Sequence, residues 1–206
     1  MWQQTTSLPG IFDSTIFSPP RRGPVASSAY IKAMHPKTEI APTRASVEKI
    51  LRAGWAGQLK IHGHRAQIHI SADESDETIA YNRQGRPHKK LLSDEIIEEL
   101  RRILGLGKGW TVIDAEWMKP DGKLYLFDIL KLDDELLRHK SYADRYKLLP
   151  TSFISPHVKV LPLLTTPEKC MEVLANTQDH IEGLVFKSLT TKGFEDSSIV
   201  RCRKKL

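Results

Sequence analysis

Apolar and polar residues alternate along several short stretches of the chain. Alternation with a period of two is typical of strands that bury one face. It predicts strands over residues 59–71, 78–83, 110–118, 123–130, 158–163, 183–188 and 199–203. The first stretch is interrupted at His62, Gly63 and His64, which indicates a hairpin with Lys60 near its turn.

Helical spacing is clearest after Ser93, where apolar residues recur three or four positions apart and form one stripe. Ser93 is placed to cap this helix, and Gly105 and Gly107 are placed to end it. The stripe consists of Ile96, Ile97, Leu100, Ile103 and Leu104. Shorter helices are expected over residues 45–53, 142–149 and 167–175. Helices and strands that mix without a regular βαβ rhythm predict an α+β domain of largely antiparallel sheets flanked by helices.

Residues 1–42 differ from the rest of the chain because they are rich in Ser, Thr and Pro. A stretch with prolines at its centre cannot sustain a regular helix, so we expect an extended N-terminal arm. Residues 43–206 are numerous enough to form one sizeable folded domain.

The 206 residues are 40% hydrophobic and 27% charged, which is ordinary for a soluble globular protein. No apolar run approaches the roughly 18 residues of a membrane span, so no membrane partner is expected. Cys170 and Cys202 match no metal-ligand spacing and are too few for a disulfide framework, which favours a reducing cytosol. The net charge of +6, with basic clusters at 83–90, 101–108 and 201–205, favours a polyanionic partner, although solvated surface charge explains it equally well.

Two segments carry the candidate chemistry: residues 60–65 (Lys-Ile-His-Gly-His-Arg) and residues 182–187 (Glu-Gly-Leu-Val-Phe-Lys). Two lysines, a carboxylate and an arginine are the groups needed to handle a nucleoside triphosphate. A neutral amine can attack an α-phosphate, and a buried lysine beside other cations loses its proton readily. Fixed positive charges and a metal spread the charge of the transition state. On a strand, Gln58, Lys60 and His62 would point to one face.

At these residues the chain resembles the covalent nucleotidyltransferases, which are ATP-dependent DNA ligases, RNA ligases and mRNA capping enzymes. Their signature is Lys-x-Asp-Gly-x-Arg followed far downstream by Glu-Gly-x-x-x-Lys, and the resemblance covers residues 58–203. It implies a nucleotidyltransferase (adenylation) domain over 43–206, with Lys60 as the catalytic nucleophile that becomes lysyl-AMP. It also implies that Gln58 reads the adenine edge and that Arg65 binds the nucleotide.

The first motif leaves the nucleic-acid substrate open. His62 stands where the family commonly has Asp, as in one branch of RNA ligases, whereas Arg65 is the DNA-ligase and capping-enzyme choice. Residues 82–85 (Asn-Arg-Gln-Gly) resemble the ligase motif Ser/Thr-Arg-x-Gly, which implies that Arg83 contacts the nucleotide and the nick phosphate. A planar guanidinium suits bidentate phosphate contact, although an ordinary turn arginine also fits a match this short.

Residues 113–116 (Ile-Asp-Ala-Glu) and 124–130 (Leu-Tyr-Leu-Phe-Asp-Ile-Leu) resemble the family's Asp-x-Glu and Leu-x-x-Phe-Asp-Ile/Leu-Leu pair. The resemblance implies that Glu116 holds the ribose or a metal-bound water and that Phe127 stacks on the purine, with Asp128 structural. A two-residue loop at Asp121 and Gly122 would make Glu116 and Phe127 direct cross-strand partners. A three-residue loop starting at Pro120 would instead shift the register by one and separate their faces.

Residues 182–187 are the second strong motif, and the resemblance assigns Glu182 to Mg²⁺ or its waters and Lys187 to the α-phosphate. The two are five positions apart, so they line one pocket only if Gly183 permits a bend or bulge. Residues 199–203 occupy the place of the family's Trp-x-Lys-x-Lys, which implies that Arg201 and Arg203 hold the triphosphate tail. The helix over 142–149 resembles a Tyr-x-x-Arg pattern that marks the fold.

The leading hypothesis is an ATP-dependent DNA ligase that seals nicks in duplex DNA through lysyl-AMP and an adenylylated 5′-phosphate. It would use ATP with Mg²⁺ or Mn²⁺, bind its metal through Glu182 and Glu116, and act as a soluble intracellular monomer. DNA is favoured over RNA. The alternatives are an RNA ligase of the Lys-x-His-Gly type, a GTP-dependent capping guanylyltransferase, and a non-catalytic nucleic-acid-binding module. The chain ends three residues after Arg203, so no OB-fold domain is expected.

Overall fold

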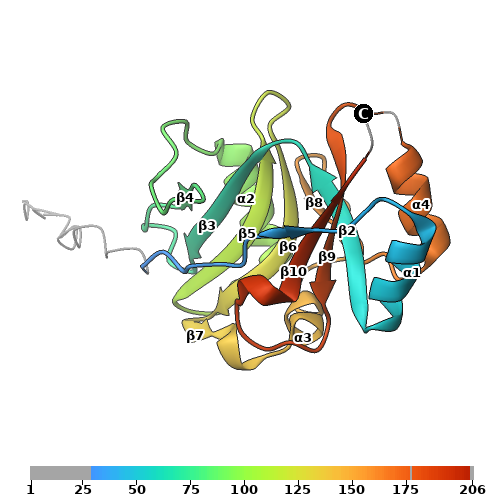
Figure 1. Ribbon diagram of the computed structural model, residues 1–206. Coiled ribbons are helices and arrows are strands. Elements are labelled where there is room, and N and C mark those ends of the chain that lie inside the picture. The colour runs from blue at the N-terminus through green and yellow to red at the C-terminus, as the bar shows by residue number, and fades with distance from the viewer. Residues whose placement is uncertain (1–28, 177, 205–206) are drawn as a thin grey trace, which may run out of the picture.

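The computed structural model describes residues 29–176 and 178–204, which form two β-sheets and their covering helices (Figure 1). The four-stranded sheet has the order β1-β10-β9-β2, and the larger sheet has the order β4-β3-β5-β6-β7, with β8 also paired to β6. Only the pairings β1–β10 and β6–β8 are parallel among the ladders of the described residues. The strands are β1 (Thr38–Glu39), β2 (Trp55–Ile61), β3 (His64–Ser71), β4 (Ile79–Tyr81), β5 (Trp110–Met118), β6 (Lys123–Leu132), β7 (Glu135–Leu136), β8 (Val158–Val160), β9 (Ile181–Ser188) and β10 (Ile199–Arg203).

Helices cover one face of each sheet. Helix α2 packs its apolar stripe on the larger sheet, where Ile96, Leu100 and Ile103 share a buried cluster with residues of β3, β5 and β6. Helices α1 and α4 lie side by side on the smaller sheet, and their Val47 and Cys170 are buried in one cluster with residues of β9 and β10. The helices are α1 (Arg44–Arg52), α2 (Asp94–Leu104), α3 (Tyr142–Tyr146) and α4 (Pro167–Ala175), with short 3₁₀ turns η1 (Leu137–His139) and η2 (Asp196–Ser198). The expected α+β architecture of mainly antiparallel sheets flanked by helices is confirmed.

Local sequence signals set the helix ends. Thr43 accepts a hydrogen bond from the backbone N–H of Ser46 at the start of α1, and Gly105 ends α2 in the left-handed conformation with φ of 55°. Ser93 occupies the N-cap position of α2 as expected, but its side chain makes no capping hydrogen bond. Pro167 begins α4 at a position where its missing N–H is not needed.

The hairpin predicted over residues 59–71 is wrong, although both of its strands form. Strand β2 pairs with β9 in the smaller sheet, while β3 pairs with β4 and β5 in the larger sheet. The link at His62 and Gly63 therefore passes from one sheet to the other. A Cβ on Gly63 would lie 3.0 Å from Glu116 Cγ and 3.0 Å from the Trp117 carbonyl oxygen, so any larger residue at this crossing would have to displace a neighbour.

The part of the arm that the structure describes crosses from the larger sheet to the smaller one (Figure 1). We call residues 30–40 the strap. Its Ala33 and Met34 are buried, and its Thr38 and Glu39 pair with β10 as strand β1. The arm's Trp2, Phe12, Phe17, Arg21 and Arg22 lie outside the described residues. Within those residues, no helix has the length and apolar character to cross a membrane.

Candidate active site

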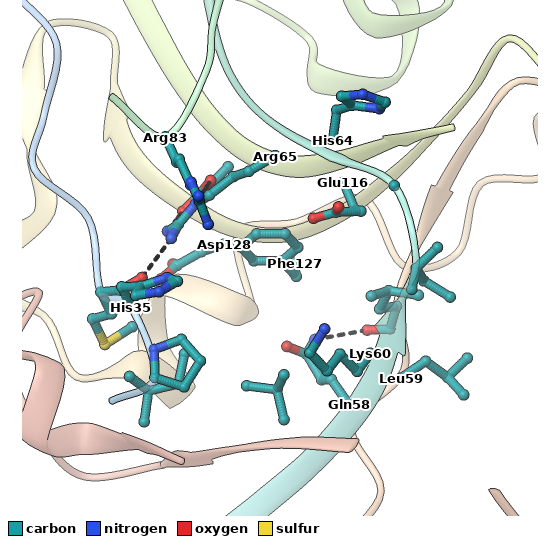
Figure 2. Close-up of a pocket in the computed structure, with 18 of the residues that line it drawn as sticks. His35, Gln58, Leu59, Lys60, His64, Arg65, Arg83, Glu116, Phe127 and Asp128 are labelled. Carbon is teal, nitrogen blue, oxygen red and sulfur yellow. Dashed lines mark hydrogen bonds and ion pairs between the residues drawn. The ribbon is translucent and has the colours of Figure 1, made fainter. Parts of the chain in front are cut away.

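A cavity of about 590 Å³ lies between the two sheets. Figure 2 shows Gln58 and Lys60 of β2 on one wall, with Glu116 of β5 and Phe127 of β6 on the opposite wall. The sequence-predicted residues that line it are Gln58, Lys60, Arg65, Arg83, Glu116, Phe127, Glu182 and Lys187. The structure thus brings eight of the ten predicted site residues together, and Arg201 and Arg203 remain outside the lining.

Lys60 and Glu182 are in direct contact, with the ammonium against Glu182 Oε2. His62 Nδ1 lies 2.7 Å from the other carboxylate oxygen, so one carboxylate holds both side chains of the first motif. Burial disfavours ionisation of Glu182, but the contacts with Lys60 and His62 outweigh it and lower the pKa of this carboxyl group. The expectation that Lys60 lies among cations is therefore not met, since its direct partner is the Glu182 carboxylate.

A β-bulge at Glu182 allows the second motif to serve one cavity, as the sequence analysis required. Lys60 pairs with Gly183 whereas Ile61 pairs with Ile181, which leaves Glu182 as the extra residue. Gly183 has φ of 141°, and a Cβ there would lie 2.3 Å from the Cys202 carbonyl oxygen. Only glycine fits this position, and the bulge turns Glu182 and Lys187 towards the same space.

Arg65 is fixed between β5 and the strap. Its guanidinium forms a bidentate ion pair with Asp114, in which Nε donates to Oδ1 at 2.9 Å, and it also donates to the Met34 carbonyl at 2.6 Å. Burial opposes its charge, but the Asp114 carboxylate more than compensates and raises the Arg65 pKa. The positive charge beside the cavity is therefore permanent.

Glu116 faces the same cavity from β5. Burial raises the pKa of its carboxyl group to about 7, although Lys60 and Arg65 both act in the opposite direction. A carboxyl with this pKa is poised to change charge near neutral pH when a cation or a phosphate arrives.

Neither of the two loops considered for the β5–β6 hairpin is observed, and the pairing of Glu116 with Phe127 is wrong. Met118 pairs with Lys123, so the turn contains four residues, and Glu116 faces Tyr125 instead of Phe127. Phe127 is the extra residue of a bulge, because Ala115 pairs with Leu126 and Asp114 with Asp128. Glu116 and Phe127 still line one cavity. Compared with the two-residue loop, the partner of Glu116 is displaced by two positions, so Phe127 stays on the same face of β6. The bulge also brings Asp128 into the lining of the cavity.

Behind the lining residues Gln58, Phe127 and Lys187 lies a hydrogen-bonded network around the buried Tyr142. The Tyr142 hydroxyl lies 2.8 Å from Gln58 Oε1, and Gln58 Nε2 donates to the Leu161 carbonyl at 3.0 Å. Lys187 donates to that hydroxyl and to the Phe127 carbonyl at 3.3 and 3.2 Å, and its ammonium stands 4.4 Å from the centre of the Phe127 ring. Burial lowers the Lys187 pKa to about 8.

Arg83 reaches the cavity from the turn after β4, next to His35 of the strap (Figure 2). Burial and the neighbouring Arg65 and Arg83 lower the His35 pKa. Arg201 and Arg203 share a face of β10, and both bind Glu39 of the strap.

Comparisons with solved structures match this arrangement of sheets. The structure titled Pmar-Lig_PreS3 is similar with a TM-score of 0.52 and 16% identity, over 81% of this chain and 46% of that one. A structure from an analysis of Lig E DNA ligases has a TM-score of 0.52 and 12% identity, over 85% of this chain and 70% of that one. The two sheets and their helices therefore have a fold similar to that of these two structures.

The ligase domain of LigD from M. tuberculosis is also similar, with a TM-score of 0.49 and 20% identity, over 79% of this chain and 58% of that one. The chain thus spans between 46% and 70% of the length of these three structures. No protein-family model matches the sequence. No curated protein matches it either.

Some residues in and around the cavity were not predicted from the sequence. Asp114, Tyr142 and His35 are the clearest examples. Asp114 was recognisable because it lies two positions before Glu116 on the same strand face, and Tyr142 because it belongs to the Tyr-x-x-Arg pattern. Nothing in the sequence marks His35, which lines the cavity only because the strap passes over the site.

Arg145 of that pattern is buried, and its Nε donates to Asp128 Oδ1 at 2.9 Å. Asp128 is therefore occupied by a structural ion pair even though it borders the cavity. Breaking a buried pair of this kind is costly because one charge is left without a partner.

Across residues 29–176 and 178–204, no group of three or more His, Cys, Asp or Glu side chains forms a ready metal site. Two carboxylates, Glu116 and Glu182, nevertheless face the cavity. One or two carboxylates together with substrate phosphates are the usual ligands of Mg²⁺ bound with a nucleotide. Two carboxylates fit a metal that a phosphorylated ligand would help to bind.

Proposed function

We propose that the chain is an ATP-dependent polynucleotide ligase that seals nicks in duplex DNA through a lysyl-AMP intermediate. The observation that carries the proposal is the assembly of Lys60, Glu182 and Lys187 with Arg65, Glu116 and Phe127 around one cavity. These residues come from five strands of two sheets, and each has the chemistry that a nucleotide transfer needs.

Lys60 is the nucleophile of this proposal. Its neutral amine attacks the α-phosphorus, an N–P bond forms, and the bond to the bridging oxygen breaks as pyrophosphate leaves. The ammonium must lose a proton first, and Glu182 holds the amine at the edge of the cavity until substrate enters. The AMP then passes to a 5′-phosphate, and a 3′-hydroxyl displaces it to join the strands.

The other charged residues of the site would bind the phosphates and the metal. Arg65 and Lys187 place positive charge on two sides of the cavity, where they can stabilise negative charge that develops on the α-phosphate. Glu116 and Glu182 would hold Mg²⁺ or Mn²⁺, which supplies charge neutralisation on the polyphosphate when it is bound. Arg83, on the opposite side from Lys60, would contact the nucleotide and the 5′-phosphate of the nick.

The base would lie against the Phe127 ring. Stacking of a base on an aromatic ring contributes roughly 1–3 kcal/mol. Gln58 presents its amide from β2, fixed by Tyr142 and by the Leu161 carbonyl, so its orientation is set before the base arrives. A fixed amide can discriminate adenine from guanine through the donors and acceptors of the base edge.

An RNA strand is the second candidate substrate, and one contact favours it. His62 stands where the family commonly has Asp, as in one branch of RNA ligases, and its contact with Glu182 supports a role for this histidine in the site. Arg65 and Arg83 remain the arguments for DNA.

Incubation with α-labelled ATP, or with α-labelled GTP, followed by a denaturing gel tests the proposal. Label from ATP is expected on the wild-type chain and on Lys159→Ala, an exposed lysine of β8, and not on Lys60→Ala. Label from GTP alone would indicate a capping guanylyltransferase. Absence of label from both nucleotides would leave only a binding module. Joining of nicked DNA compared with nicked RNA then identifies the substrate.

A further inference from the structure

The strap is fastened to both sheets, and the cavity lies between its two attachments. On the larger sheet, the Gln67 side chain pairs with both backbone groups of Ile31 at 2.8 Å, in the manner of a neighbouring strand. Arg65 donates to the carbonyl of Met34 in the same region. Residues 34–36 then line the cavity directly.

The second attachment is to β10 and the turn before it. The backbone N–H of His35 donates to Asp196 at 2.9 Å, and Lys37 forms an ion pair with the same carboxylate. Strand β1 adds a ladder of two residue pairs, Thr38 with Val200 and Glu39 with Arg201. A two-residue ladder is a short attachment that can part without disturbing the sheet behind it.

Glu39 is held by both arginines of β10. Its Oε2 accepts from Arg201 Nε at 2.9 Å and from an Arg203 terminal nitrogen at 2.8 Å, while Oε1 accepts from Arg203 Nε at 3.1 Å. These hydrogen bonds lower the Glu39 pKa to about 2, so its carboxylate is charged over the whole physiological range.

The two arginines lie next to residues that line the cavity. Arg201 pairs across the sheet with Val185, and Arg203 pairs with Gly183, which follows Glu182. Val185 and Glu182 both line the cavity, as does Ile199, which shares a face of β10 with Arg201. An anionic group that extends out of the cavity past Val185 therefore meets these guanidinium groups first.

We propose that Glu39 is an internal anion that masks a polyphosphate-binding pair, Arg201 and Arg203, until the tail of a nucleoside triphosphate displaces it. The inference rests on the proposed nucleotide site and adds a regulatory contact to it. The exchange is feasible because all three side chains are partly exposed, and exposed ion pairs are weak. A triphosphate tail offers the two guanidinium groups several charged oxygens, whereas Glu39 offers them two.

Binding of inorganic tripolyphosphate, measured by calorimetry at low ionic strength, tests the masking directly and requires no lysine chemistry. Glu39→Gln should bind tripolyphosphate about two- to tenfold more tightly than the wild type. Glu168→Gln removes a carboxylate from another exposed ion pair, with Arg44, and should bind like the wild type. AMP lacks the outer phosphates, so its affinity should be the same in the wild type and in Glu39→Gln.

The tightening should disappear when Glu39→Gln is combined with Arg201→Gln and Arg203→Gln. Equal or weaker tripolyphosphate binding by Glu39→Gln in a chain of unchanged melting temperature would overturn the masking, as would tightening that persists without the arginines. An equal change for AMP would show that Glu39 only holds the cavity wall in place, which also overturns it. Labelling of Lys60 by ATP is scored separately, so loss of the proposed function and loss of this inference give different results.

Discussion

Lys60 and Glu182 are 122 residues apart in the sequence, and their side chains touch across β2 and β9. The same carboxylate also holds His62. The proposed nucleophile is therefore restrained by a carboxylate before nucleotide arrives. A substitution at Glu182 therefore tests how much the position of the Lys60 amine contributes to the reaction, because it leaves Lys60 itself unchanged.

Glu182→Gln should slow formation of lysyl-AMP by about 10²–10³-fold, because it removes a charged contact to the reacting groups. The amide has the same shape as the carboxylate, so the melting temperature should change little. Rapid-quench labelling with α-labelled ATP measures the rate. A near-normal rate in a folded variant would show that Glu182 of β9 has only a structural role.

Lys187→Met should also slow adenylation by about 10²-fold while leaving the fold intact. The lysine is buried, and an apolar side chain of similar volume removes the cost of keeping a charge out of water. Labelling rate and thermal melting are measured on the same preparation. Loss of both together would mean that Lys187 serves the fold and not the phosphates.

Gly183→Ala should destabilise the chain by about 2–4 kcal/mol, because its Cβ collides with backbone atoms of β10. Gly122→Ala is the matched control, since Gly122 also has a positive φ of 59° but a Cβ there meets no heavy atom within 4 Å. That control should lose only about 1 kcal/mol. Urea unfolding gives both values, and equal losses would contradict the close approach at the bulge.

Glu116 makes the stability of the folded chain depend on pH. Its folded pKa of about 7 lies above the ordinary value of 4.5, so the folded state binds more protons than the unfolded state between these values. The stabilisation is therefore complete below about pH 4.5 and is lost as the pH rises through 7.

Relative to Glu116→Gln, the wild type should lose up to about 3 kcal/mol of unfolding free energy over this range. Urea unfolding at a series of pH values, with chelator to remove divalent metal, checks this. Glu98→Gln, an exposed position of α2, should follow the wild type. Parallel curves for the wild type and Glu116→Gln would contradict the burial of this carboxyl group.

Two N-terminal deletions should give different results. Removing residues 1–42 takes away the cavity lining at 34–36 together with Glu39, so it should lower the melting temperature and impair adenylation. The sequence motifs alone favour intact adenylation after that deletion, because they all lie beyond Gln58. Because the strap lines the cavity, we expect adenylation to be impaired.

Removing residues 1–28 keeps the strap and tests whether Arg21 and Arg22 help to hold duplex. Adenylation should survive while nick binding weakens. The slope of log K against log salt should fall by about 0.9 for each phosphate that the shortened chain no longer neutralises. An unchanged slope, measured by fluorescence anisotropy across a salt series, would remove residues 1–28 from the duplex interface.

Local patterns were sufficient to predict most elements of the fold. The alternation over 110–118 and 199–203 predicts β5 and β10 with their observed starts, and Pro167 marks the start of α4. The bulge at Gly183 was predictable because Glu182 and Lys187 are an odd number of positions apart yet share one cavity.

Strand partners and registers were not predictable in the same way. Alternation shows which face of a strand is buried but not which strand lies beside it, so β2 and β3 were wrongly joined as a hairpin. The register of Glu116 depends on a four-residue turn and on a bulge at Phe127, and neither leaves a periodic signal. The pairing of Glu39 with Arg201 joins residues 162 positions apart and depends on the complete fold.

The passage of the chain from one sheet to the other at His62 and Gly63 has a thermodynamic consequence. Lys60 and Glu182 belong to the smaller sheet, whereas Arg65, Glu116 and Phe127 belong to the larger sheet, so neither sheet contains a complete binding site. Any ligand that bridges the cavity binds only when the sheets are docked, and at a concentration 100 times its Kd it would stabilise that state by about 2.7 kcal/mol. The ligand therefore acts as a removable crosslink between two halves of the fold, and hydrogen exchange at the seam between the sheets should slow in proportion to its occupancy.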